Sequence, residues 1–160
     1  MYVFGYGGDE DKTMKMREAG HWNNQANELE ARGDFVGVES LFLRSLARKI
    51  ELTGEDSLQT AFSRNALGEL YLKMNGRIED AQKMLEDADR VRSGVFLSFV
   101  IDEFDAACAC DNLGQLWEIK GDVVKAREVR GRNPKSMICS NFNLSVFTLS
   151  TENQNQVNRL

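Results

Sequence analysis

Three features of this 160-residue chain could carry chemistry: its cysteines, its single histidine and a glycine-rich segment near the N-terminus. Two of the three cysteines form the pair Cys108-Ala109-Cys110. On a helix, residues two positions apart point about 200° away from each other. The two thiols therefore cannot converge on one metal ion or form a disulfide unless the helix unwinds. We interpret both as core or surface cysteines, and an enzyme that uses Cys108 or Cys110 as a nucleophile is kept as an alternative.

The remaining candidates do not assemble into a catalytic pattern. His21 has no nucleophile that the sequence can place beside it. Residues 5–8 lack both the preceding strand and the Lys-Ser/Thr pair of a phosphate-binding loop. Neighbouring acids such as Glu28 and Glu30 are typical of the polar face of an amphipathic helix. We therefore expect no enzymatic activity, no catalytic residue, no metal site and no cofactor.

The composition indicates a helical protein that does not bind nucleic acid or membranes. The chain has 42% apolar residues, 28% charged residues, a single proline and a net charge of −5. A negative charge disfavours nucleic acid and anionic lipid as partners, and no segment approaches the roughly 20 apolar residues that span a bilayer. The first residues lack the features of a signal peptide. Three cysteines do not suggest a disulfide framework, so we expect a cytoplasmic protein, with the nucleus as the alternative.

The clearest helical pattern lies between residues 65 and 88. Apolar residues recur there at spacings of three and four on both sides of Asn75-Gly76. This periodicity predicts two short amphipathic helices joined by a tight corner. Gly68 and Ala81 place a small residue in each helix, where the two backbones can approach closely. A hairpin of this size cannot bury its apolar face alone, and therefore copies of it are expected.

Copies are present on both sides. The corner glycines Gly33, Gly76 and Gly121 are 43 and 45 residues apart, and small residues recur at matching distances from each. Helix N-caps are predicted at Asp34, at Asp122 and at residue 56 or 57. The prediction is an all-α fold, an α-solenoid of three helix-turn-helix hairpins and about six helices. The hairpins cover about residues 16–54, 57–93 and 96–132 of a repeat domain 14–134, between a flexible arm (1–13) and an irregular, disordered polar tail (135–160).

Two segments carry a family resemblance. LGELYLKMNGRIEDAQKMLEDA (residues 67–88) and NLGQLWEIKGDVVKAREV (residues 112–129) resemble tetratricopeptide repeats (TPR). Both have Leu-Gly, an apolar residue three positions after the glycine, a corner glycine and then a small residue. The period exceeds the family's usual length of about 34 residues and is closer to that of kinesin-light-chain-like members. HEAT and armadillo repeats have a similar period but lack this arrangement. The match departs at Val38, at Arg130 and at one extra residue before Gly76.

The tail resembles a second family more weakly. Residues up to about 143 are similar to the entrance of a MYND-type zinc finger. The expected second cysteine after Cys139 is replaced by Leu144, and no later Cys or His could complete four zinc ligands. A truncated zinc-finger protein, with the repeats as its targeting arm, is therefore the alternative function.

The TPR resemblance implies a protein-interaction scaffold. In this family the first helix of each hairpin lines a concave groove that holds a partner peptide or helix. Asn and Gln side chains can bind an extended backbone, and the acids would select basic segments. Pro134 shortens the last helix, so self-association through the last repeat is also considered. Carried over to this chain, the groove residues are Asn23, Asn27, Glu30, Asn65, Glu69, Lys73, Asp111, Gln115 and Glu118.

Overall fold

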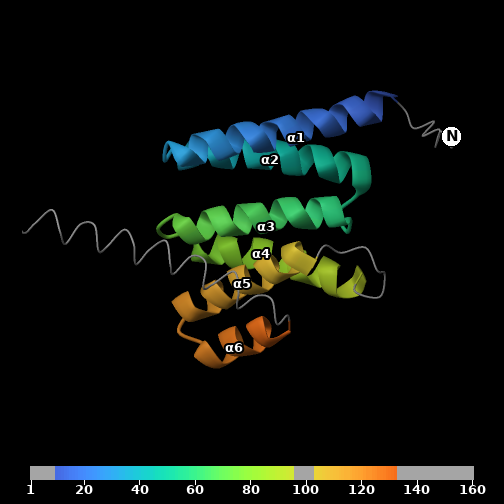
Figure 1. The fold of residues 1–160 in the computed structure, drawn as a ribbon. Coiled ribbons are helices and arrows are strands. Elements are labelled where there is room, and N and C mark those ends of the chain that lie inside the picture. The colour runs from blue at the N-terminus through green and yellow to red at the C-terminus, as the bar shows by residue number, and fades with distance from the viewer. Residues whose placement is uncertain (1–9, 96–102, 133–160) are drawn as a thin grey trace, which may run out of the picture. The chain divides into compact units, whose positions relative to one another are not determined.

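The structure, a computed structural model, describes residues 10–95 and 103–132, which form six α-helices (Figure 1). The helices are α1 (Glu10–Ala31), α2 (Phe35–Thr53), α3 (Leu58–Lys73), α4 (Ile78–Val95), α5 (Glu103–Ile119) and α6 (Val123–Gly131). No strand occurs in the described ranges. The all-α class and the six helices predicted from the sequence are thereby confirmed. None of the helices described is long and apolar enough to cross a lipid bilayer.

Two helices extend beyond the approximate bounds of the predicted hairpins. The first helix begins at Glu10 rather than at Met14, because acidic residues in the first turn are stabilised by the helix dipole and Asp11 pairs with Lys15 at 2.6 Å. The fourth helix continues through Ser93-Gly94 to Val95. A glycine in a helix costs only about 1 kcal/mol relative to alanine, so it need not end the helix. The rest of the predicted arm and the predicted tail 135–160 lie outside the described residues.

The three corners follow the predicted chemistry. Gly33, Gly76 and Gly121 all have φ between 77° and 82°, a conformation that other residues adopt only with strain. At the first corner the Gly33 N–H donates to Glu30 O (2.9 Å) and the Asp34 N–H to Leu29 O (3.1 Å). This is the Schellman pattern of helix ends, and the corner at Gly121 repeats it with 3.0 and 2.8 Å bonds. The Gly76 corner differs, as its extra residue implies.

Each new helix also begins at a side-chain cap. Asp34 Oδ1 accepts from the Gly37 N–H at 3.0 Å, and Asp122 Oδ1 accepts from the Lys125 N–H at 2.9 Å. Ser57 caps α3 through the Thr60 N–H. These bonds satisfy backbone donors that have no partner inside the helix. The caps predicted at Asp34 and Asp122 are confirmed, and Ser57 is the cap at the third position.

The chain divides into two compact units, Met1–Arg92 and Ser93–Leu160, which we describe separately. In the first unit, α1 packs on α2 and α2 packs on α3. The core between the helices is built mainly from small and aliphatic side chains. Its most buried apolar members are Ala19, Ala26, Val38, Ala61, Leu67, Leu70, Ala81, Leu85 and Ala88.

Gly68 lies at a close contact between α3 and α4. A Cβ atom at this position would lie 2.5 Å from Leu85 Cγ and 3.5 Å from the Ala81 carbonyl oxygen. Leu85 is 1% exposed and cannot move away without disturbing the core. The pairing of small residues predicted for this hairpin is therefore what lets α4 pack on α3.

A buried lysine lies between α2 and α3. Lys49 is 6% exposed and its ammonium group donates to Ser63 Oγ at 2.8 Å. Among the described residues no carboxylate lies within ion-pair distance of Lys49 Nζ. Burial lowers the pKa of Lys49 from its ordinary value of 10.5 because the charged form loses its hydration. Nearby, Ser45 Oγ donates to the Ala19 carbonyl oxygen at 3.0 Å and joins α2 to α1.

We predict that Gly68→Ala destabilises the protein by about 1–3 kcal/mol because the new methyl group overlaps Leu85. The matched control is Gly20→Ala in α1, where a Cβ atom would meet nothing within 4 Å. This control should gain up to about 1 kcal/mol from helix propensity. Urea unfolding measures both changes, and a shift of the same sign in the two variants would contradict the close approach.

We predict that Lys49→Met/Ser63→Ala raises the free energy of unfolding by about 1–3 kcal/mol, since it replaces a buried charge and leaves no hydroxyl unpaired. The lowered pKa also gives a pH dependence. Between the lowered pKa of the folded protein and 10.5 the unfolded chain binds more protons at Lys49 than the folded protein does, so stability rises with pH across that window. Unfolding curves over this range should show the rise in the wild type and a smaller rise in the double variant. Equal slopes would refute the assignment.

Candidate functional site

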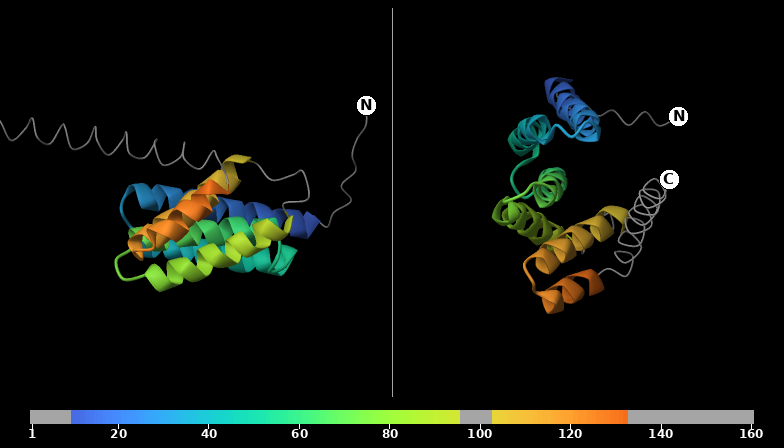
Figure 2. Two further views of the ribbon diagram at one scale, coloured as in Figure 1. Left: turned by 90° about the horizontal axis from the view of Figure 1, so that it is seen from below. Right: turned by 90° about the vertical axis from the view of Figure 1, so that its left-hand side faces the viewer.

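The groove residues predicted in the first unit lie on α1 and α3. These helices lie on one side of the unit Met1–Arg92, with α2 and α4 on the other (Figure 2, right). Asn27, Glu69 and Lys73 are exposed, whereas Asn23 and Asn65 are half-buried. Asn65 already interacts within the chain. The amide groups are thus spread along the two helices and differ in how fully a partner could reach them.

The structure brings three of the predicted residues together. Lys73 Nζ donates to Glu30 Oε1 at 2.7 Å and to Glu69 Oε1 at 2.9 Å, and we call these residues the Lys73 triad. The triad joins the C-terminal ends of α1 and α3. Burial opposes the charge on Lys73, but the hydrogen bonds to Glu30 and Glu69 outweigh it and raise the pKa of Lys73 above 10.5. The triad carries a net charge of −1, because Lys73 neutralises one of the two negative charges predicted for this surface.

A second cluster at the hairpin corners was not predicted. Tyr71 Oη donates to Glu39 Oε1 at 2.9 Å, and Arg77 Nη2 donates to the same oxygen at 2.9 Å. The Arg77 guanidinium also lies 4.4 Å from the centre of the Tyr71 ring and pairs with Asp80 at 2.5 Å. The hydrogen bond from Arg77 lowers the pKa of Glu39. Burial, with the bond to Glu39, raises the pKa of Tyr71 to about 12.

This cluster fastens α2 to the second hairpin. Glu39 lies near the start of α2, and its partners lie more than 30 residues away along the chain. No local spacing in the sequence could have indicated it, because Glu39 is one of many acids on polar helix faces. Its groups are already paired with each other, so we regard the cluster as structural.

In the second unit, two of the predicted groove residues form ion pairs with Arg130. Arg130 Nε donates to Asp111 Oδ1 at 3.1 Å, and the Arg130 guanidinium also pairs with both oxygens of Glu118. Gln115 Nε2 donates to Asp111 Oδ2 at 3.0 Å. Asp111 is only 4% exposed. The Asp111 carboxylate is therefore buried and already paired inside the unit, which leaves little of it for a partner to reach.

Arg130 fills a space that the family pattern gives to a large apolar side chain. A Cβ atom at Gly114 would lie 2.6 Å from Arg130 Nε and 2.8 Å from its Cγ. The arginine stem thus covers Gly114, as Leu85 covers Gly68 in the preceding hairpin. Hydrogen bonding to Glu118 outweighs burial and raises the pKa of Arg130. The departure at Arg130 is compatible with the hairpin because Asp111 and Glu118 neutralise the charge.

We predict that Arg130→Leu, which restores an apolar residue, destabilises the hairpin by about 2–4 kcal/mol because Asp111 loses its charge partner inside the fold. Arg130→Leu/Asp111→Asn should recover at least half of this loss, since the amide needs no counter-charge. Chemical unfolding followed by circular dichroism compares the two. If Arg130→Leu alone were as stable as the wild type, the buried pair would not hold the hairpin.

The residues first considered for chemistry are described only in part, since residues 5–8 lie outside the described ranges. Cys108 and Cys110 are half-buried thiols of α5. In the ranges 10–95 and 103–132 no group of three or more His, Cys, Asp or Glu side chains is arranged to hold a metal ion. Cys139 and the rest of the segment compared with a MYND-type finger lie outside the described residues.

Comparisons with known proteins agree with this geometry. The tetratricopeptide-repeat family matches residues 17–92. No curated protein matches the chain. The crystal structure of BtubC (BKLC) from P. vanneervenii is similar, with a TM-score of 0.67 and 28% sequence identity. The match covers 77% of this chain and 48% of that one, so the chain spans about half the length of BtubC.

The family match covers the first two hairpins, the same helices that carry the small-residue packing and the Lys73 triad. Repeats of this family generally mediate protein–protein interaction. The corner glycines, the paired helices and the two comparisons lead to one identification. Residues 17–92 belong to the tetratricopeptide-repeat family, and the described part of the chain has an all-α helical repeat fold.

Proposed function

We propose that the protein is a non-enzymatic interaction module that binds a partner peptide or helix across α1 and α3. The observation that carries this proposal is the Lys73 triad, which lies between the two helices that line the binding face in this family. The proposed contact residues are Asn23, Asn27, Glu30, Asn65, Glu69 and Lys73. Gln115 and Glu118 are proposed as a separate contact in the second unit, and Asp111 is left out.

The amide side chains supply contacts that do not depend on the partner's sequence. Each Asn offers one acceptor oxygen and a donor NH₂ group, which match the N–H and C=O of an extended backbone. Asn27 is exposed and Asn23 lies one helical turn before it on α1. Because the helices are held by close packing, little conformational entropy is lost when a peptide binds.

The acids supply charge selection. Lys73 is 44% exposed at the side chain and Glu69 is 48% exposed, so both exchange contacts with water readily. An incoming Lys or Arg could take one carboxylate of the triad while Lys73 keeps the other. The net charge of −1 then favours a basic segment over an acidic one. The gain is modest, because exposed ion pairs contribute little and are screened by salt.

We predict that a random peptide library displayed on phage and selected on the full chain yields peptides enriched in Lys and Arg. Their affinity should fall at least about tenfold in Asn23→Ala/Asn65→Ala, because backbone-directed hydrogen bonds are lost. Glu30→Gln/Glu69→Gln should reduce the enrichment and the salt dependence together. Isothermal calorimetry on one selected peptide measures both effects.

Gln25→Ala is the matched control. Gln25 is exposed on α1, two residues beyond Asn23 and so about 200° around the helix from it. The Gln25→Ala variant should bind the selected peptide with the same affinity as the wild type. Selected peptides that bind the asparagine variant as tightly as the wild type would rule out this face, and peptides without basic enrichment would rule out the charge selection.

A further inference from the structure

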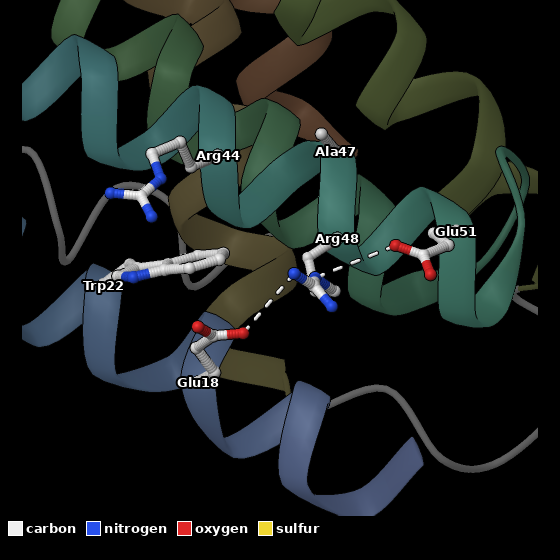
Figure 3. Close-up of a pocket in the computed structure, with 6 residues that line it drawn as sticks. All are labelled: Glu18, Trp22, Arg44, Ala47, Arg48 and Glu51. Carbon is white, nitrogen blue, oxygen red and sulfur yellow. Dashed lines mark ion pairs between the residues drawn. The ribbon is translucent and has the colours of Figure 1, made fainter. Parts of the chain in front are cut away.

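The first hairpin has a shallow pocket that uses none of the proposed groove residues. It has a volume of about 310 Å³ and is lined by residues of α1 and α2 (Figure 3). Trp22 forms its floor, and two arginines one helical turn apart on α2 lie against the indole ring. The lining residues are Glu18, Trp22, Arg44, Ala47, Arg48 and Glu51.

The two arginines differ in how their charge is neutralised. Arg48 lies 3.4 Å from Glu18 and 3.7 Å from Glu51, and its side chain is 25% exposed. Arg44 is exposed and lies 4.4 Å from the centre of the Trp22 ring. Among residues 10–95 and 103–132 no carboxylate lies within ion-pair distance of Arg44. The pocket thus holds one arginine with an internal counter-charge and one without.

Trp22 adds a second unused donor. It is 8% exposed, and within the described part of the chain its indole N–H has no hydrogen-bond acceptor. Figure 3 shows the Arg44 guanidinium over the nitrogen-bearing end of the indole ring. The indole nitrogen is not among the buried side-chain atoms that lack a partner in the described residues, so a ligand can reach its N–H from solvent. It lies beside a cation that also lacks an anion. The Trp22 indole N–H and the Arg44 guanidinium are both hydrogen-bond donors that an anionic oxygen ligand would satisfy.

A similar pair elsewhere in the protein already has a carboxylate bound to it. Arg77 lies over the Tyr71 ring at 4.4 Å, the same separation as Arg44 over Trp22. There the aromatic O–H and the guanidinium both donate to one carboxylate, that of Glu39. The Trp22–Arg44 pair presents the same combination of an aromatic donor and a stacked guanidinium. Only the carboxylate is missing.

We propose that this pocket binds an Asp or Glu side chain of a partner protein. The carboxylate would accept from Arg44 and from the Trp22 indole N–H, in the way that Glu39 accepts from Arg77 and Tyr71. A planar carboxylate suits the guanidinium fork. Glu18 and Glu51 border the pocket, and their charges oppose a dianionic phosphate more strongly than a singly charged carboxylate. This surface goes beyond the proposed groove, because it contains no residue of α3.

The test uses the indole N–H signals of the two tryptophans in a ¹⁵N–¹H spectrum of the full chain, with Trp22→Phe to assign them. The probe is a capped peptide, Gly-Ser-Glu-Glu-Ser-Gly, and the control peptide carries Gln in place of Glu. We expect the Glu peptide, and not the Gln peptide, to shift the Trp22 signal. Arg44→Gln should weaken this binding at least about tenfold, as expected for a charge-assisted hydrogen bond. The exposed Arg127→Gln in α6 should not weaken it.

Three results would overturn the proposal. The first is an equal shift with the Gln peptide, and the second is unchanged binding in Arg44→Gln. The third is inorganic phosphate that binds more tightly than the Glu peptide, because the pocket would then be a phosphate site. Arg44 is exposed, so its variant should fold, and a circular dichroism melt checks this. The peptides selected from the phage library are not used here, so either proposal can fail without the other.

Discussion

The close approach of two helices at a residue without a side chain is the contact on which this structure depends. Because Gly68 has no Cβ atom, Leu85 can occupy the space that a side chain at position 68 would take, and α4 can pack directly on α3. Gly114 does the same for Arg130 in the second unit. The corner glycines, with their positive φ, then return the chain at the angle that this packing needs. The spacing of helices within each hairpin, and hence the faces they offer to a partner, follows from these few positions.

Polar interactions add further links between the packed helices. Glu39 ties α2 to the second hairpin through Tyr71 and Arg77, and the Lys73 triad joins α1 to α3. Such pairs stabilise little when exposed, but they fix which polar groups remain for a partner. One surface retains a net negative charge, and the pocket over Trp22 retains a cation. These are the two places that we propose for contact with a partner, and they differ in charge.

Much of the fold could be predicted from the sequence because its signals are local. Helical periodicity, the corner glycines and the Asp34 and Asp122 caps each depend on residues a few positions apart. The start of α1 lies before the predicted hairpin, where an Asp11–Lys15 ion pair adds to the first turn, and α4 extends past its predicted hairpin because a helix tolerates the small cost of one glycine. The site was less predictable. Asp111 was placed in a groove, yet it pairs with Arg130, 19 residues away, and the Trp22 pocket needs two helices in register before it exists.

We propose that partners bind across the first helices of the hairpins. Amide hydrogen exchange of the full chain, with and without a peptide selected from a random library, tests this claim most directly. The bound peptide should slow exchange in α1 and α3 and leave α2 and α4 at their free rates. Protection confined to α2 and α4, or no protection by a peptide that binds, would contradict it.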